Sequence, residues 1–563
     1  MQKLVKEKRM GQSVGKENKK WICLVIIIMV LQFFVASYFC IQKQGFHYDE
    51  YYSYYSSNVT YGLVPTDREW KDVGEITSEF QVREGEGFRY GLVKTMQGFD
   101  VHPPLYYMIL HTICSFFPGV FSKWFGLGLN LALFVVCFWL MAYLANHIFK
   151  GNKKMVIAAC LLYGFQTGVL SGITFIRMYM LLTVWCLAIT LWHKKVWQEG
   201  LHMTVSRSAG LSVLVMLGFL THYYFAVFMF FTAAFICLYY WLVKKNLKSS
   251  IYYGLAVCLG MGTAVVIYPS CLSHIFRGYR GTEATDAFFD MSNTVLRFNF
   301  FTDLMNQSVF GGCFWFLVLI LLLLMIGVNW GLKRTEKKEK WSSFVEENTG
   351  IVHIGVVTAG YFLVVAKTAL LNAEEANRYE LPVYGFIMML VMAAFYFQLQ
   401  KLGGLLKLSK KVGKETVAVN GKGEKNYLKV AGFLLVGIVL SCQIFALTQD
   451  KVQFLYRQDR ENVEWAAKQK EKAILYLYNP NNVWMIWDEA EELMQYDNIY
   501  FVSLSDVSPI TDNILLEEEE IYVYASRMEE ADILIEQLLE DNVHIKQKEH
   551  VRELLYCDLY HLH

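Results

Sequence analysis

Residues 21–41 have the sequence WICLVIIIMVLQFFVASYFCI, an apolar run without a charged residue that follows a basic head at 1–20. A helix needs roughly 20 consecutive apolar residues to cross a bilayer. The run is too long for the core of a typical secretory signal peptide, and no small-x-small cleavage site follows it. It therefore predicts an uncleaved first transmembrane helix.

Similar apolar runs recur along the chain. Of its 563 residues, 55% are apolar and 18% are charged, whereas globular domains usually carry about 25% charged residues. The 12 cysteines are scattered without metal-ligand spacing and are predicted to be small apolar residues. About eleven spans are predicted, at about 22–41, 124–149, 155–171, 178–193, 208–222, 223–243, 251–271, 309–331, 351–371, 382–400 and 428–448.

Lysine and arginine divide the connections into two groups. The head and alternate connections hold 29 of them, whereas the short connections on the other side hold five arginines and no lysine. The positive-inside rule then predicts a cytoplasmic N-terminus at 1–21 and a C-terminus outside, in a multi-pass protein of the cell membrane. If Pro103–Phe117 were counted as a span, the later basic connections would lie outside the cell. The segment is therefore predicted to be a re-entrant or interfacial helix within an external loop at 42–123. The basic stretch at 401–427 is predicted to be a cytoplasmic linker.

Residues 449–563 differ in character, with 25 Asp and Glu against ten Lys and Arg. Strand-like runs at 473–478, 498–504 and 520–525 alternate with helical patterns at 483–496 and 528–541. This alternation predicts a small extracytoplasmic α/β domain. The fold class expected overall is thus an all-α membrane bundle at 22–448 followed by an α/β domain at 449–563.

Polar side chains collect at the predicted outer boundary of the bundle. Such residues are costly near spanning helices and usually functional. They are Asp49, Glu50, Asp100, His102, Arg177, Tyr179, His222, Tyr223, Lys367, Arg378 and Tyr379. Taken singly, each has a structural interpretation: Lys367 can extend to the interface, and the tyrosines can form an aromatic belt. Their convergence on one face favours a binding or catalytic site.

These motifs resemble the membrane glycosyltransferases of the GT-C fold. The similarity is to bacterial members of glycosyltransferase family 39, the relatives of protein O-mannosyltransferases and aminoarabinose transferases. The most specific match is Asp-x-His-Pro-Pro-Leu-Tyr-Tyr at 100–107. The others are Asp-Glu at 49–50, Arg-Met-Tyr at 177–179, Thr-His-Tyr-Tyr at 221–224 and Arg-Tyr-x-Leu-Pro at 378–382. No motif in 449–563 matches the family.

The resemblance implies a GT-C-type bundle and a hexosyl or pentosyl transferase. The donor would be a polyprenyl-phosphate-linked sugar, and the acceptor an extracytoplasmic protein, cell-wall polymer or lipid. By the same resemblance, Asp49 is the general base, with Glu50 and Asp100 beside it, and the anomeric configuration is inverted. Arg177, Lys367 and Arg378 are the cations expected to bind the donor phosphate, since cations stabilise the charge that grows on such a leaving group. His102, Tyr179, His222, Tyr223 and Tyr379 are expected to line the donor site.

Two questions stay open at this stage. Asp49, Glu50, Asp100 and His102 would suit Mg²⁺ or Mn²⁺ as ligands, but Asp100 and His102 could instead cap the Pro-Pro helix without an ion. The alternative functions are a transporter or flippase of a lipid-linked substrate, and a sensor whose spans serve only as anchors. Transporters place charges at mid-membrane, often in two related halves, and neither feature is present in this sequence. The predicted partners are the lipid-linked donor, the acceptor and membrane lipids. Nucleic acid is not expected as a partner.

Overall fold

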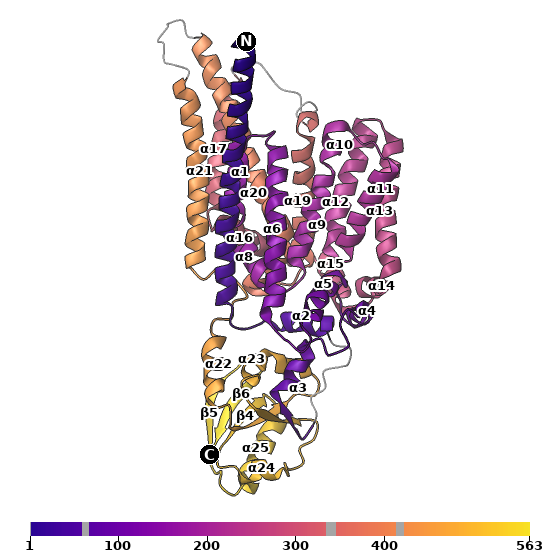
Figure 1. Ribbon diagram of the computed structural model, residues 1–563, viewed down its shortest axis with the longest axis vertical. Helices are drawn as coiled ribbons and strands as arrows, with labels where there is room; N and C mark the ends of the chain where they lie inside the picture. Colours follow the sequence, from indigo (N-terminus) through magenta and orange to yellow (C-terminus); the bar gives the residue numbers. More distant parts are fainter. Residues whose placement is uncertain (1, 59–66, 334–344, 413–421) are drawn as a thin grey trace.

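The computed structural model describes residues 2–58, 67–333, 345–412 and 422–563. A helical bundle forms one part of the molecule, and a smaller α/β domain is attached to one of its ends (Figure 1). The N-terminus lies at the opposite end, together with α10 (Lys194–Glu199). Among the described residues, the start of the N-terminal helix and α10 therefore mark one end of the bundle and the α/β domain marks the other.

The bundle is built from long apolar helices. Its elements are α1 (Gln2–Gln42), α6 (Lys123–Ile148), α7 (Lys153–Tyr163), α8 (Thr167–Thr174), α9 (Tyr179–Trp192), α11 (Val205–Phe219), α12 (Tyr224–Leu238) with η2 (Tyr239–Val243), α13 (Leu247–Ile267), α16 (Thr294–Phe310), α17 (Phe314–Lys333), α19 (Thr349–Thr368), α20 (Asn377–Val412) and α21 (Lys422–Thr448). Part of the predicted linker at 401–427 is thus helical, and 413–421 lie outside the described residues.

Fewer spans are supported by length and composition than the eleven expected. Among the described residues, seven helices are long and apolar enough to cross a membrane, and the number rises to nine if two bent pairs each form one span. The expected spans at 178–193 and 208–222 correspond to α9 and α11, of 14 and 15 residues. At 1.5 Å per residue such helices are about 21–23 Å long, less than the ~30 Å hydrocarbon core.

Glutamine side chains satisfy the backbone near the two breaks. The α7–α8 pair bends by 53° and the α16–α17 pair by 89°. Gln32 Nε2 donates to the carbonyls of Cys160 and Leu161, and Gln443 Nε2 donates to those of Leu162 and Val309, all at 2.7–3.0 Å. A broken helix is tolerated at membrane depth only when such freed groups find partners.

Short helices gather at the end of the bundle that faces the α/β domain (Figure 1). They are α2 (Tyr48–Asn58), α3 (Val73–Thr77), η1 (Ser78–Phe80), α4 (Tyr90–Phe99), α5 (Leu105–Ser115), α14 (Ser270–Phe276), α15 (Tyr279–Phe289) and η3 (Ala373–Ala376). The segment predicted to be re-entrant or interfacial contains α5, whose 11 residues extend only about 16 Å. It packs against α2, α4 and α6.

The α/β domain has one mixed six-stranded sheet with the order β1-β3-β2-β4-β6-β5. The strands are β1 (Glu69–Asp72), β2 (Ala473–Tyr478), β3 (Asn498–Ser503), β4 (Ile521–Ser526), β5 (Lys548–Glu553) and β6 (Cys557–Leu562). Between them lie α22 (Asp459–Lys468), η4 (Val483–Glu489), α23 (Ala490–Leu493), α24 (Asn513–Glu517) and α25 (Glu529–Asp541). β3, β2 and β4 are parallel, and every residue of β2 is buried. Alternate residues of β2 enter the two cores on opposite faces of the sheet, which is typical of a parallel sheet covered on both sides.

One strand of this sheet comes from the first loop of the bundle. β1 pairs antiparallel with β3, from Glu69 opposite Phe501 to Asp72 opposite Asn498. The Asp67 carboxylate accepts a hydrogen bond from the Ser503 backbone N–H. The long loop between the two acidic motifs is therefore in part an edge strand of the α/β domain, and it joins the two parts of the molecule.

Candidate active site

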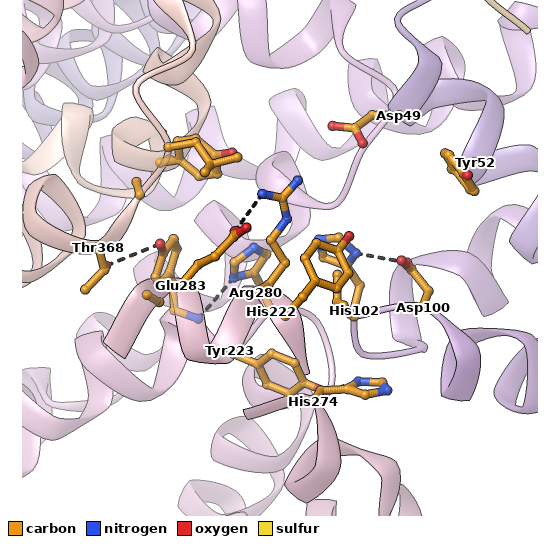
Figure 2. Close-up of a pocket in the computed structure, with 18 of the residues that line it drawn as sticks. Asp49, Tyr52, Asp100, His102, His222, Tyr223, His274, Arg280, Glu283 and Thr368 are labelled. Carbon is orange, nitrogen blue, oxygen red and sulfur yellow. Dashed lines mark hydrogen bonds and ion pairs between the residues drawn. The ribbon is translucent and has the colours of Figure 1, made fainter. Parts of the chain in front are cut away.

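A large cavity lies where the bundle meets the α/β domain. Its volume is about 1540 Å³, and its walls come from α2, the α4–α5 connection, α15, α20 and the η4 region of the α/β domain. Figure 2 shows Asp49 and Asp100 approaching it from separate segments, with His102 and His222 beside them. Residues from many distant parts of the sequence thus share one space.

Helix α2 brings the first acidic pair to the cavity. Asp49 and Glu50 both lie in its first turn, where the helix dipole favours negative charge. Successive residues of a helix point about 100° apart. Only Asp49 lines the cavity, and its side chain is 22% exposed.

The Asp49 carboxylate lies between two buried arginines. Its Oδ1 is 3.6 Å from Arg177 Nη2, and its Oδ2 is 3.6 Å from Arg378 Nη2 and 3.7 Å from His47 Nδ1. These distances exceed a hydrogen bond, and no described group donates one to the carboxylate oxygens. Burial raises the pKa of Asp49, but the charges of Arg177, His47 and Arg378 outweigh it and hold that pKa below its usual range. The group is therefore ionised, and the lowered pKa makes it a weaker base than an ordinary carboxylate.

Glu50 is instead fully buried and fully engaged. Its Oε2 accepts hydrogen bonds from Lys43 Nζ at 2.8 Å and from the His47 backbone N–H at 2.7 Å. Its Oε1 accepts one from the Ile176 backbone N–H at 2.7 Å. Glu50 does not line the cavity. Its contacts instead connect α2 to the α8–α9 connection.

Asp100 and His102 form a second polar pair in the cavity wall. Asp100 Oδ2 lies 2.9 Å from His102 Nδ1, and Arg177 Nη2 lies 3.4 Å from the same nitrogen. Within the described residues neither side chain caps α5: the N-cap residue Pro104 makes no side-chain capping hydrogen bond, and the Leu105 backbone N–H donates to the Leu220 carbonyl. Burial and the charge of Arg177 together lower the pKa of His102 despite the opposing charge of Asp100, so the imidazole is neutral at pH 7.

Both arginines are held by aromatic rings. Arg177 and Arg378 are only 3% and 2% exposed. The Arg177 guanidinium lies 5.8 Å from the Tyr107 ring centroid, and that of Arg378 lies 5.1 Å from both Phe175 and Tyr379. Cation–π contacts of this kind stabilise guanidinium groups that have lost water. The two cations are therefore fixed in place rather than free to follow a ligand.

The predicted aromatic and histidine residues do converge. Tyr179 lies 5.4 Å from His222 and 5.9 Å from Tyr379 between ring centroids. His222 is 6.1 Å from His102, and the Tyr223 hydroxyl lies 2.9 Å from His274 Nδ1. All of these side chains line the cavity.

Lys367 is not brought into the cavity. Its Nζ donates to the Asp290 carbonyl and, at 3.2 Å, to Asn293 Oδ1. The residue is 6% exposed. It therefore ties α19 to the α15–α16 connection instead of facing the space that Asp49 and the arginines enclose.

Several wall residues were not predicted from the sequence. Tyr48, Arg280, Asn481 and Trp484 line the cavity, and the Trp484 ring lies 5.5 Å from that of Tyr48. Arg280 pairs with Glu283 at 3.0 Å on α15. Asn481 and Trp484 belong to the α/β domain, and no local sequence signal indicates that this part of the chain reaches Asp49.

The four possible metal ligands do not form one group in the described structure. Asp49 lies against the arginines, Glu50 is taken up by Lys43, and Asp100 contacts His102. Within the described ranges, no three of these four side chains lie close enough together to bind a single ion.

Comparisons with known proteins give a distant structural match. No protein-family model matches the chain, and no curated protein is similar enough in sequence to match. Two crystal structures of ArnT from Cupriavidus metallidurans align with it, one bound to undecaprenyl phosphate and one in the apo state. Both have a TM-score of 0.46. Their identities are 11% and 12%, they cover 96% and 97% of this chain, and each is itself covered over 98% of its length. At this distance the likeness assigns neither a family nor a substrate to the chain.

Proposed function

We propose that this protein transfers a sugar from a polyprenyl-phosphate donor to an acceptor at the membrane surface. The observation that carries the proposal is the arrangement of Asp49: an ionised carboxylate in a large cavity, between two buried arginines, whose oxygens accept no hydrogen bond from the residues that the structure describes. A hydroxyl acceptor must lose a proton as it attacks the anomeric carbon, and a positioned carboxylate can take that proton.

In this proposal the two arginines bind the donor phosphate. Arginine recognises phosphate through paired N–H donors, and Arg378 has two buried nitrogens, Nε and Nη1, without a hydrogen-bond partner in the described structure. Fixed cations of this kind stabilise the charge that develops on a leaving phosphate. A bound phosphate would also offset the positive field on Asp49, which would raise its pKa towards the ordinary range and make it a better base.

The α/β domain is proposed to contribute to the acceptor side of the same cavity. Asn481 and Trp484 line the cavity that Asp49 borders, and the Trp484 ring packs against Tyr48 of α2. An amide that forms hydrogen bonds and a ring that packs against an apolar face are typical of a specific binding pocket. With the donor phosphate bound to the arginines, the acceptor hydroxyl would attack the anomeric carbon from this side of the cavity. The lipid phosphate would leave in the same step, and the anomeric configuration would be inverted.

The test is an incubation of purified protein with a panel of polyprenyl-phosphate sugars, scored for release of lipid phosphate on addition of candidate acceptors. We expect release with one or more donors, and a loss of at least 100-fold in Arg378→Ala. Arg277→Ala is the matched control, because Arg277 is exposed and does not line the cavity. Movement of an intact donor across proteoliposomes without phosphate release would replace this proposal with the transporter alternative.

A further inference from the structure

A group of two histidines and one glutamate lies on the α/β domain, away from the cavity. One ligand atom from each of Glu549, His561 and His563 lies within 4.8 Å of the others. Within the ranges that the structure describes, these are the only three His, Cys, Asp or Glu side chains so placed. None of the three lines the cavity.

The antiparallel pairing of β5 and β6 brings these side chains together. Glu549 on β5 lies directly opposite His561 on β6, and opposed side chains share one face of a sheet. His563 follows two residues later, so it points to the same face. Its backbone N–H and carbonyl pair with Gln547 at 3.1 and 2.8 Å, and the two imidazole rings are 4.7 Å apart. The ladder therefore fixes the spacing of all three.

A carboxylate outside the group holds one of the histidine rings. His561 Nε2 lies 3.1 Å from Glu520 Oε2, and Glu520 is itself paired with Lys472. The His561 ring also stacks on Tyr522, with centroids 4.5 Å apart and planes 15° apart. Histidines that bind metals usually give their second ring nitrogen to a carboxylate, which fixes the tautomer and the ring orientation. Neither contact is needed for a solvated surface histidine.

We propose that Glu549, His561 and His563 bind a Zn²⁺ ion, with a fourth position left to water. Two imidazoles and one carboxylate match the ligands that zinc prefers, whereas magnesium and calcium prefer oxygen ligands alone. The ion would join the edge strand β5 to β6. Edge strands expose unpaired backbone groups and need protection, so the expected role is to stabilise this edge of the domain. The proposal is independent of the transferase function.

The experiment uses the full-length protein in detergent without a polyhistidine tag, stripped with EDTA and dialysed at pH 7.5. Zn²⁺ is titrated by calorimetry, and Co²⁺ is titrated by absorption, which reports its coordination geometry. We expect one Zn²⁺ per chain, and a raised unfolding temperature in its presence. His561→Gln and His563→Gln should each weaken binding at least tenfold, and Glu520→Gln should weaken it about 10- to 100-fold, as is usual for an outer partner of a metal ligand.

His550→Gln is the matched control, since this histidine also lies on β5 but outside the group and is 50% exposed. It should bind zinc as the unaltered protein does. A double variant, His561→Gln with His563→Gln, that binds zinc with unchanged affinity and stoichiometry would overturn the proposal. So would the absence of saturable binding to the unaltered protein at 100-fold excess zinc.

Discussion

Replacing Asp49 by Asn should separate donor binding from turnover. A phosphate that contacts Arg177 and Arg378 must approach the carboxylate that lies 3.6 Å from each of them. At a separation of ~6 Å and an effective dielectric constant of ~20, two unit charges repel by about 3 kcal/mol. Water in the cavity screens part of this repulsion. If half of the repulsion energy remains, it amounts to about 1.4 kcal/mol, which corresponds to a factor of ten in affinity. Asp49→Asn is therefore expected to bind polyprenyl phosphate about tenfold more tightly.

Turnover should change in the opposite direction. Loss of a general base typically costs a factor of about 100 to 10,000, so lipid phosphate release should fall by that factor while the dissociation constant decreases. Binding is measured by thermophoresis of labelled protein in detergent, and folding by size exclusion and thermal unfolding. Asp286→Asn is the control, because it removes a charge from the same wall without an arginine partner within 4 Å in the described structure. Unchanged or weaker phosphate binding in a folded Asp49→Asn protein would refute the electrostatic argument, and retained turnover would remove Asp49 from the base role.

Three further outcomes follow from other contacts. Lys43→Met should lower the free energy of unfolding by about 3–5 kcal/mol, because it leaves the fully buried Glu50 without its charge partner; a loss below 1 kcal/mol in denaturant titration would contradict this. Trp484→Ala should raise the KM for the acceptor while leaving the affinity for polyprenyl phosphate within twofold, and equal effects on both would argue against an acceptor wall. Burial raises the pKa of Glu491 and Asp459 to about 7. Such groups favour the folded state below their unfolded pKa and lose that contribution as the pH rises through 7. Thermal stability should therefore fall between pH 5 and pH 8, and a slope that is unchanged in Glu491→Gln would exclude this source.

The central strands of the α/β domain could be predicted closely from the sequence. The runs at 473–478, 498–504 and 520–525 correspond to β2, β3 and β4 with ends that differ by a residue at most. Each is a short apolar run bounded by polar residues, and such a run is fixed by burial on both faces. The predicted helix at 483–496 is instead η4 and α23.

The edge strands could not be predicted in the same way. β5 has the sequence KEHVRE and is mostly exposed, so no hydrophobic alternation marks it. β1 has the sequence EWKD, and its partner β3 lies more than 400 residues further along the chain. Pairing of this kind depends on tertiary contacts, which single-sequence patterns do not contain. The same pairing brings the first loop to the α/β domain.

For the candidate site, the sequence predicts at which end of the bundle a side chain lies but not which way it points. The sequence placed Asp49, Asp100, His102, Arg177 and Arg378 on one face of the bundle, and the structure brings them to one cavity. Depth can be predicted because it follows from hydropathy and charge along the chain. The direction in which a side chain points at a helix end cannot be predicted in this way. Adjacent side chains point about 100° apart, and a single helical turn is too short to show an amphipathic pattern.

Glu50 and Lys367 were assigned to the site from the sequence, but neither side chain lines the cavity. Both lie at the same end of the bundle as Asp49 and Arg378, yet each faces a partner in the protein: Glu50 contacts Lys43, and Lys367 contacts the Asp290 carbonyl. A buried charge with a close partner contributes to the fold, since removing the partner leaves it uncompensated. Asp49 and Arg378 differ from them because they are 3.6 Å apart and border open space. Asp49 and Arg378 form no hydrogen bond with each other, and this difference in contacts, rather than residue type, distinguishes the proposed catalytic pair from the buried ion pair of Glu50 and Lys43.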